Sequence, residues 1–434
     1  MGGGGSGRGG MSKAAPSGGS SSGAGAMSEA GRERCMRWIS VGAMINSLSW
    51  TVVTTAQLGL GAQLAPSRGH LVQMTALMRS AAQLTAFFCL PACGALSDRV
   101  GRRPVLVVRS FIVFLFSGLI FLRPRSYAMF LTHRFISNLT HHLTDATTNA
   151  CVADLFQGQR LAGATASLRS QMGVAMLAGP ALGGRIAEIS FPLCFGISAL
   201  CGLLNILVFG FVPETRDRAA TTSDRGRLRA VNPVSFLALF RGGRTLATLT
   251  LAVGISEMCD GTTEIDRYYA QEVVGLSLTQ NGLYQSMRGA AMIVGGRLVK
   301  PALAALGVTR FTTMCNAAAA VHMLGKATAR APAQFFSALV PHVFGAGSYR
   351  EAALRARVMQ LALARGMSRG EVAASEANFR ALLSTAAPFL YSTLYNMTRS
   401  SSGWLQGAPY YLCAGLLACS HLTFMTLPRE ELEV

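Results

Sequence analysis

About twelve apolar segments follow one another along this chain, and they restrict its possible folds more than any other feature of the sequence. Each segment is close to the ~20 residues that a helix needs to cross a hydrocarbon core of ~30 Å. Within lipid a backbone must satisfy its own hydrogen bonds, so segments of this length are predicted to be helices. The expected spans are 36–64, 70–93, 104–122, 126–150, 164–184, 191–212, 245–263, 281–300, 311–328, 331–350, 377–395 and 408–427.

The composition agrees with a membrane protein of many spans, since 50% of the residues are hydrophobic, only 14% are charged and the mean hydropathy is positive. The net charge of +19 raises the question of a nucleic-acid partner. The basic residues, however, fall in short clusters between apolar stretches, so we interpret the charge as a topology signal and expect the bilayer, not nucleic acid, as the surrounding partner.

Lysine and arginine are concentrated in the loops on the side of the N-terminus, which predicts that both termini are cytoplasmic. Arg267 and Lys326 are expected among the few basic residues of the outer loops. The protein is predicted to lie in the plasma membrane or an organelle membrane, as a monomer.

The order of the segments predicts an all-α membrane protein of twelve transmembrane helices in two pseudo-symmetric six-helix bundles, with a substrate path between them. Residues 1–35 are rich in Gly and Ser, and they are expected to be a disordered cytoplasmic N-terminus or an organellar transit segment. The expected units after it are the bundles 36–212 and 245–428, the cytoplasmic linker 213–244 and the tail 429–434.

Four short motifs occur in order near helix ends. GALSDRVGRRP, residues 94–104, lies between the second and third spans. ADLFQGQR follows the fourth span, GVAMLAGPALGG lies in the fifth, and PETR follows the sixth. Together they resemble the major facilitator superfamily, closest to its drug:proton antiporter branch, which includes tetracycline-resistance proteins. The residues that carry the match in the first and third motifs are Gly94, Asp98, Arg99, Gly101, Arg102 and Arg103, and Gly179, Pro180, Gly183 and Gly184.

The resemblance implies that the first motif is a conformational switch, with Asp98 facing the positive end of helix 11. The alternative for Arg102 and Arg103 is that they only fix topology. For the glycines of helix 5 the resemblance implies antiport, while close helix packing is the alternative.

Ionisable residues inside the spans are costly and therefore candidates for function. Helix 4 carries a polar stripe at intervals of three and four residues, which places it on one helix face. Helix 7 carries Glu257 and Asp260, with Glu264 expected already in the outer loop, and Arg79 and Arg288 lie on helices 2 and 8. The stripe of helix 4 consists of Arg134, Asn138, His141, His142, Asp145 and Asn149.

Arg134 and Asp145 are 11 residues apart, about 16 Å along the axis, so each needs another partner. We expect Glu257 or Asp260 to pair with Arg134 or Arg288. The hypothesis is that Glu257, Asp260 and Asp145 handle protons, with His141 and His142 as relays.

Arg134 matches the arginine of the family's motif B, although the glycines that follow it there are missing in RFISNLT. The alternative for all these charges is that they pair between helices and hold the bundle together.

No metal site, P-loop or nucleophile arrangement is recognisable, so we expect no cofactor and no enzymatic activity. The predicted function is secondary active transport of a small organic solute, as proton-coupled export. Arg79, Arg134 and Arg288 also favour an organic-anion substrate, so an organic-anion or sugar-like facilitator or symporter is one alternative. A non-transporting receptor or scaffold with the same fold is the other.

Overall fold

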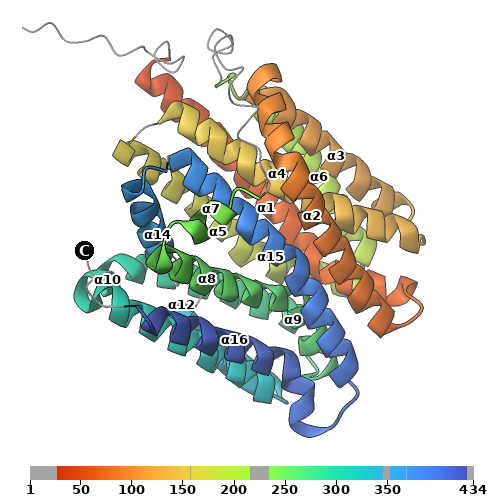
Figure 1. Cartoon of the computed structure of the whole chain (residues 1–434). Helices are drawn as coiled ribbons and strands as arrows, with labels where there is room; N and C mark the ends of the chain where they lie inside the picture. Colours follow the sequence, from red (N-terminus) through yellow and green to blue (C-terminus); the bar gives the residue numbers. More distant parts are fainter. Residues whose placement is uncertain (1–26, 157, 216–233, 346–351, 368, 428–434) are drawn as a thin grey trace, which may run out of the picture.

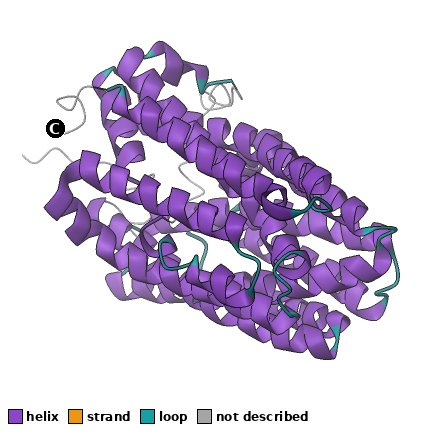
Figure 2. Ribbon diagram, turned by 90° about the horizontal axis from the view of Figure 1, so that it is seen from below, coloured by secondary structure: helices purple, strands orange, loops and turns teal. Residues whose placement is uncertain are grey.

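A computed structural model describes residues 27–156, 158–215, 234–345, 352–367 and 369–427. Across these ranges the chain consists of helices joined by short loops, and no strand occurs among them (Figure 2). This agrees with the expected all-α class, because long apolar segments at helical length leave no unpaired backbone in a lipid environment.

Six long helices come first, and serine residues begin several of them. The hydroxyl oxygens of Ser28, Ser67 and Ser126 accept hydrogen bonds from the backbone N–H groups of Gly31, His70 and Met129, which otherwise lack a partner in the first turn. The six are α1 (Glu29–Leu64), α2 (Arg68–Val100), α3 (Arg102–Leu122), α4 (Tyr127–Leu155), α5 (Gly158–Ile189) and α6 (Phe191–Phe211).

The second part of the chain is more interrupted. The longest element, α10 (Leu278–Thr328), is two helices in one, since Gly307 has a φ of 72° that breaks the helical path. The others are α7 (Leu237–Arg241), α8 (Arg244–Met258), the 3₁₀ turn η4 (Cys259–Gly261), α9 (Thr262–Glu272), α11 (Pro332–Ser337), α12 (His342–Gly345), α14 (Ala352–Ala364), α15 (Arg369–Thr398), η5 (Gly403–Gly407) and α16 (Ala408–Met425).

Three boundaries differ from the expectation. Residues 29–35, expected to be disordered, form the first turns of α1 because Ser28 caps the helix. The seventh span does not end at 263 but continues through α9 to Glu272. The expected helix 331–350 is divided into the short helices α11 and α12. Most of the linker 213–244, the first 26 residues and the whole tail 429–434 lie outside the described residues.

Four described helices have both the length and the apolar composition to cross a membrane: α1, α3, α6 and α10. The other described helices do not meet these conditions together, and α4 among them carries an arginine, two aspartates and three histidines. Charged helices of this kind require neighbours that cover their polar faces.

Two helix pairs join the first six helices to the later ones: α5 packs along α10, and α2 along α15 (Figure 1). The start of α1 and the end of α16 lie at the same end of the molecule. We call this the terminal end, and the opposite end, with loops 65–67, 273–277 and 399–402, the far end.

Candidate functional site

Three carboxylates lie on one face of the α8 to α9 segment, at the spacing i, i+3 and i+7. Their environments differ. Glu257 and Glu264 are buried, at 4% and 3% exposure, whereas Asp260 in η4 is exposed. One helix face therefore presents an accessible carboxylate between two enclosed ones.

Glu264 forms the centre of a buried ion-pair cluster between the two parts of the chain. Its carboxylate binds the guanidinium of Arg134 on α4 and, at 3.2 Å, that of Arg79 on α2. Arg134 also donates to the side chain of Gln57 on α1. The expectation that Glu264 lies in an outer loop is wrong, because the helix extends nearly three turns further than its apolar residues indicate.

A second cluster surrounds Asp266, two residues further along α9. Its carboxylate binds the ammonium of Lys326, accepts a hydrogen bond from the hydroxyl of Tyr410 at 2.8 Å, and lies 3.4 Å from the guanidinium of Arg288. All three partners belong to the second part of the chain. Lys326 is 1% exposed, so it does not lie in an outer loop as expected.

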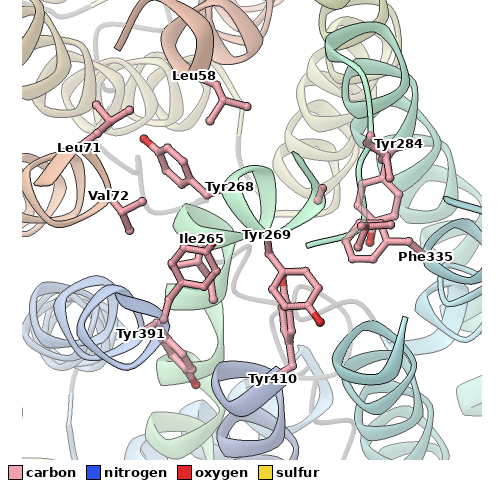
Figure 3. Close-up of a cluster of buried hydrophobic side chains, with 14 of the residues drawn as sticks. Leu58, Leu71, Val72, Ile265, Tyr268, Tyr269, Tyr284, Phe335, Tyr391 and Tyr410 are labelled. Carbon is pink, nitrogen blue, oxygen red and sulfur yellow. The ribbon is translucent and has the colours of Figure 1, made fainter. Parts of the chain in front are cut away.

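The two clusters show that α9 has two different faces. The hydroxyls of Tyr268 and Thr75 lie 3.1 Å apart, and Tyr268 points toward α1 and α2, whereas the ring of Tyr269 packs edge to face on Tyr410 (Figure 3). Glu264 and Tyr268 thus face the first six helices, and Asp266 and Tyr269 face the second part.

Arg134 and Arg288 do not pair with Glu257 or Asp260, as the sequence suggested, but with Glu264 and Asp266. Glu257 instead accepts hydrogen bonds from Arg355 at 2.9 Å and Arg380 at 3.0 Å. The sequence contained a signal for the missed pair, since TEIDR places two carboxylates and an arginine within five residues directly after an apolar span.

Asp260 has no ion pair or hydrogen bond with another described residue. It shares its helix face with Glu264 and lies one turn closer to the terminal end. On the same face, Glu257 pairs with Arg355 and Arg380 of the second part, whereas Glu264 pairs with α2 and α4, so Asp260 lies between contacts to both parts of the chain. An accessible carboxylate at this position can bind a proton or a positively charged group.

The polar stripe of α4 is in contact with α1 through His141. The ring of His141 stacks on Trp50 with centroids 5.1 Å apart, and His142 lies edge to face against His141. The side-chain amide of Asn138 donates to the carbonyl of Arg134 on its own helix. Asp145 and Asn149, which lie one and two helical turns after His141, are half-buried.

Some residues of the 94–104 motif are buried and others are exposed. Gly101 has a φ of 112° and joins α2 to α3. Arg102 is buried and binds Asp154 on α4 at 3.1 Å and Ser97 at 3.1 Å. Gly94, Arg99 and Arg103 are exposed. The side chain of Asp98 lies outside the described residues, so its expected contact with helix 11 is not described either.

The PETR motif contributes to this same loop. The carboxylate of Glu214 accepts hydrogen bonds from the backbone N–H groups of Arg102 and Arg103, at 2.8 and 3.2 Å. A Cβ at Gly101 would lie 2.3 Å from this carboxylate, so only glycine fits there. The end of α6 is thereby attached to the start of α3 through the positive end of the helix.

The glycines of α5 provide close backbone contact on two sides. A Cβ at Gly183 would lie 2.3 Å from the carbonyl oxygen of Val52 on α1, and one at Gly184 would lie 2.8 Å from that of Leu278 on α10. Gly179 packs on the side chain of Thr51 of α1. Since Pro180 has no N–H, the carbonyl of Met176 loses its helical donor, and Gly289 of α10 approaches it.

At the far end, polar contacts join the two parts of the chain. Glu272 at the end of α9 lies 3.5 Å from Arg68 on α2 and 3.7 Å from Arg399 after α15, and it accepts a hydrogen bond from Tyr395. The amide of Asn396 donates to the carbonyl of Gly69 at 2.9 Å. Glu188 of α5 accepts from the backbone of Thr279 at 3.1 Å. We call these the far-end contacts.

Comparison with known proteins finds the family model of the Major Facilitator Superfamily over residues 39–368. The class C tetracycline resistance protein of Escherichia coli is 26% identical over 358 residues, which cover 79% of this chain and 84% of that protein. Major facilitator superfamily domain-containing protein 10 of Mus musculus is 32% identical over 180 residues, which cover 41% of this chain and 38% of that protein.

Solved structures agree on the fold. The human organic anion transporter MFSD10 matches with a TM-score of 0.60 and 20% identity, over 90% of this chain and 99% of that one. The nucleoside transporter NupG matches with a TM-score of 0.68 and 11% identity in two structures, over 89 to 90% of this chain and 98 to 99% of the other. The family model, which spans more than half of the chain, identifies this protein as a member of the Major Facilitator Superfamily.

Proposed function

We propose that this integral membrane transporter exports a small organic solute in exchange for protons by alternating access. In this proposal residues 36–212 and 245–428 form two six-helix bundles with both termini in the cytoplasm, and the protein acts as a monomer. The observation that carries the proposal is the shared face of α8 and α9, where exposed Asp260 lies next to buried Glu264.

The far-end contacts define the starting state. They link α2 and α5 to α9, α10 and α15, so the path between the bundles is closed at the far end. With the terminal end in the cytoplasm, this state receives solute from inside the cell. Transport requires that the far-end contacts break and that the opposite end closes.

Glu264 controls this change in the proposal. Its bonds to Arg134 and Arg79 join the two bundles inside the membrane, where charge pairs are screened little by water. The bonds of Asp266 remain within the second bundle and move with α9. Opening the far end therefore breaks the Glu264 pairs and leaves those of Asp266 intact, and a proton on the Glu264 carboxylate lowers the cost of breaking its pairs.

Asp260 is the carboxylate that proton and solute occupy alternately. It is accessible while Glu264 is enclosed, so a proton from water reaches Asp260 first. His141, His142 and Asp145 on α4 are the proposed relays, and Asn138 the proposed polar contact, along the facing helix. Glu257 and Arg288 are proposed members of the same pathway, acting through their ion pairs.

The 94–104 motif is the proposed switch at the terminal end. Arg102 bonded to Asp154, and Glu214 bonded to the start of α3, hold the loop as one unit. Gly94, Asp98, Arg99, Gly101 and Arg103 complete this loop.

The test is transport in vesicles with and without an imposed pH gradient, with a panel of organic cations, anions and sugars. Asp260→Asn is expected to abolish the response to the gradient and to leave the melting temperature nearly unchanged, because Asp260 has no ion pair among the described residues. Glu257→Gln is the matched comparison, and it is expected to lower the melting temperature because Arg355 and Arg380 lose a charged partner.

Gradient-driven transport that persists in Asp260→Asn would remove Asp260 from the coupling step. Transport that ignores the gradient in the unmodified protein would exclude proton coupling and leave a facilitator.

A second candidate function is transport of an organic anion. The two clusters of α9 hold the basic side chains Arg79, Arg134, Arg288 and Lys326, and Arg267 lies against the first of them. Against these five stand Glu264, Asp266 and Asp260, which leaves a net charge of +2 (5 − 3). A positive surplus favours an anionic solute. The similarity to a transporter described as an organic anion transporter supports this candidate.

The sign of the transported solute decides between the candidates. An organic anion that accumulates with a pH gradient, and whose uptake falls in Arg79→Gln, would support anion transport. Transport restricted to cations would exclude it.

A further inference from the structure

Two arginines of the 94–104 motif have no role in the packing described above. Arg102 is buried and paired, whereas Arg99 and Arg103 are exposed and make no ion pair with another described residue. Only the backbone N–H of Arg103 is occupied, by Glu214. Two exposed arginines, four residues apart in the chain, therefore flank the junction where α2 ends and α3 begins.

An apolar groove begins at this loop. It lies between α2, α3 and α4 and has a volume of about 220 Å³. Leu96, Val100 and Val108 on its walls are 54%, 46% and 59% exposed, so the groove is open on the outer surface of the helices. Inside a membrane such a surface faces lipid chains.

The groove and the two arginines are continuous along the chain. Val100 and Pro104 line the groove, and they are the direct neighbours of Arg99 and Arg103. From Pro104 the groove follows α3 to Ile112, which is about 12 Å along the helix axis. Arg109 lies at its inner wall, buried, with its Nε donating to the carbonyl of Thr140. The groove is thus apolar along α3 and has two positively charged residues at the end where it begins.

We propose that this groove binds an anionic phospholipid of the leaflet at the terminal end, with one acyl chain along α3 and the phosphate on Arg99 and Arg103. The apolar walls fit a hydrocarbon chain, and guanidiniums bind phosphate oxygens through paired hydrogen bonds. The start of α3 is not the anion site, because the Glu214 carboxylate already occupies its N–H groups.

The charge at the mouth selects the headgroup. A zwitterionic lipid can fill the groove but neutralises less of the charge of the two arginines, so an anionic lipid is preferred. The lipid site shares its loop with the proposed switch, but the experiments below measure lipid binding and not transport, so either proposal can fail without the other.

The experiment measures lipid retention directly. The full chain is placed in nanodiscs of equal phosphatidylglycerol and phosphatidylcholine, and the lipids that stay bound after release into detergent are counted by native mass spectrometry. A preference of about tenfold for phosphatidylglycerol is expected, and Arg99→Gln with Arg103→Gln is expected to remove most of it.

The matched control is Arg34→Gln with Arg37→Gln, which removes the same charge from exposed positions at the terminal end of α1. It is expected to keep the preference. An equal loss in this control would show a general effect of net charge and overturn the site. A double variant at 99 and 103 that keeps the full preference would overturn it as well.

The groove itself is tested with phosphatidylglycerol that carries a photoreactive group on its acyl chain. Crosslinks are expected within residues 93–112 and 143–147, which line the groove, and Val108→Trp, which fills the groove, is expected to reduce them at least several-fold. Crosslinks elsewhere on the chain, or an unchanged yield in Val108→Trp with normal melting temperature, would overturn the proposed chain site.

Discussion

At the scale of single residues, three carboxylates on one helix face have three different chemical situations. Glu257 is paired within the second part of the chain, Asp260 is accessible, and Glu264 is paired across to the first six helices. Residue type and spacing alone do not separate these cases. The neighbours on other helices decide which carboxylate can exchange a proton and which one can connect the two parts.

Glu264→Gln is expected to destabilise the protein by about 3 to 5 kcal/mol, because it leaves Arg134 buried without its charged partner. The measurement is the free energy of unfolding in detergent. The double variant with Arg134→Gln should recover part of the loss, since the two residues share one interaction. Additive losses in the double variant would contradict a direct pair.

The sequence predicted the polar stripe of α4, of which Arg134 is buried and the other residues are half-buried, but it assigned Arg134 the wrong partner. Hydropathy ended the seventh span at 263, because Glu264, Asp266 and Arg267 resemble a loop when their partners are unknown. Lys326 was placed outside for the same reason. Charges that are neutralised inside a bundle lower the local hydropathy just as exposed charges do, so only the tertiary contacts distinguish the two.

At the scale of helices, α5 and α10 approach each other through backbone. A Cβ at Gly282 of α10 would lie 2.3 Å from the carbonyl oxygen of Pro180, and Gly184 of α5 lies opposite the start of α10. Such contact needs small residues on both helices. The sequence contained the glycines of α5, but their partners on α10 are separated from them by about a hundred residues and were not predictable.

Gly282→Ala is expected to push α5 and α10 apart, and to lower the free energy of unfolding by about 1 to 3 kcal/mol. Gly296→Ala on the same helix is the control, since a Cβ there meets no atom within 4 Å. That control should be neutral or stabilising by up to about 1 kcal/mol, because alanine is the better helix former. Equal effects at the two positions would exclude close packing as the cause.

The positions where helices are interrupted were also not predictable from the length of the apolar segments. The segment 331–350 is divided between α11 and α12, and α10 continues past position 300 to its break at Gly307. Apolar composition reports that a segment is buried or in lipid, whereas the path of the backbone depends on turns at single residues.

At the scale of the whole molecule, the far-end contacts and the Glu264 pairs join the two parts of the chain at two depths, and the proposed cycle requires both to break. A disulfide between Gly69→Cys and Asn396→Cys should therefore stop transport. The built Cβ of Gly69 lies 3.4 Å from Oδ1 of Asn396, which places the two side chains within reach of a disulfide. The background variant replaces the exposed Cys89 and Cys419 by serine.

Solute flux is measured under oxidising conditions and again after reduction, with each single cysteine variant as control. Reduction should restore transport. Full transport in the oxidised, crosslinked protein would show that the far end need not open.

The far-end contacts and the Glu264 pairs also respond differently to the ionic strength of the solution. Arg68 is 53% exposed and its partner Glu272 15%, so dissolved ions reach and screen this pair, whereas the Glu264 pairs are enclosed. In the proposed cycle, the ionic strength outside the membrane thereby adjusts the outer of the two barriers, and the inner one depends on the protonation of a single carboxylate. A transporter with this cycle is expected to open more readily in a salty medium than in fresh water, without any change in its response to pH.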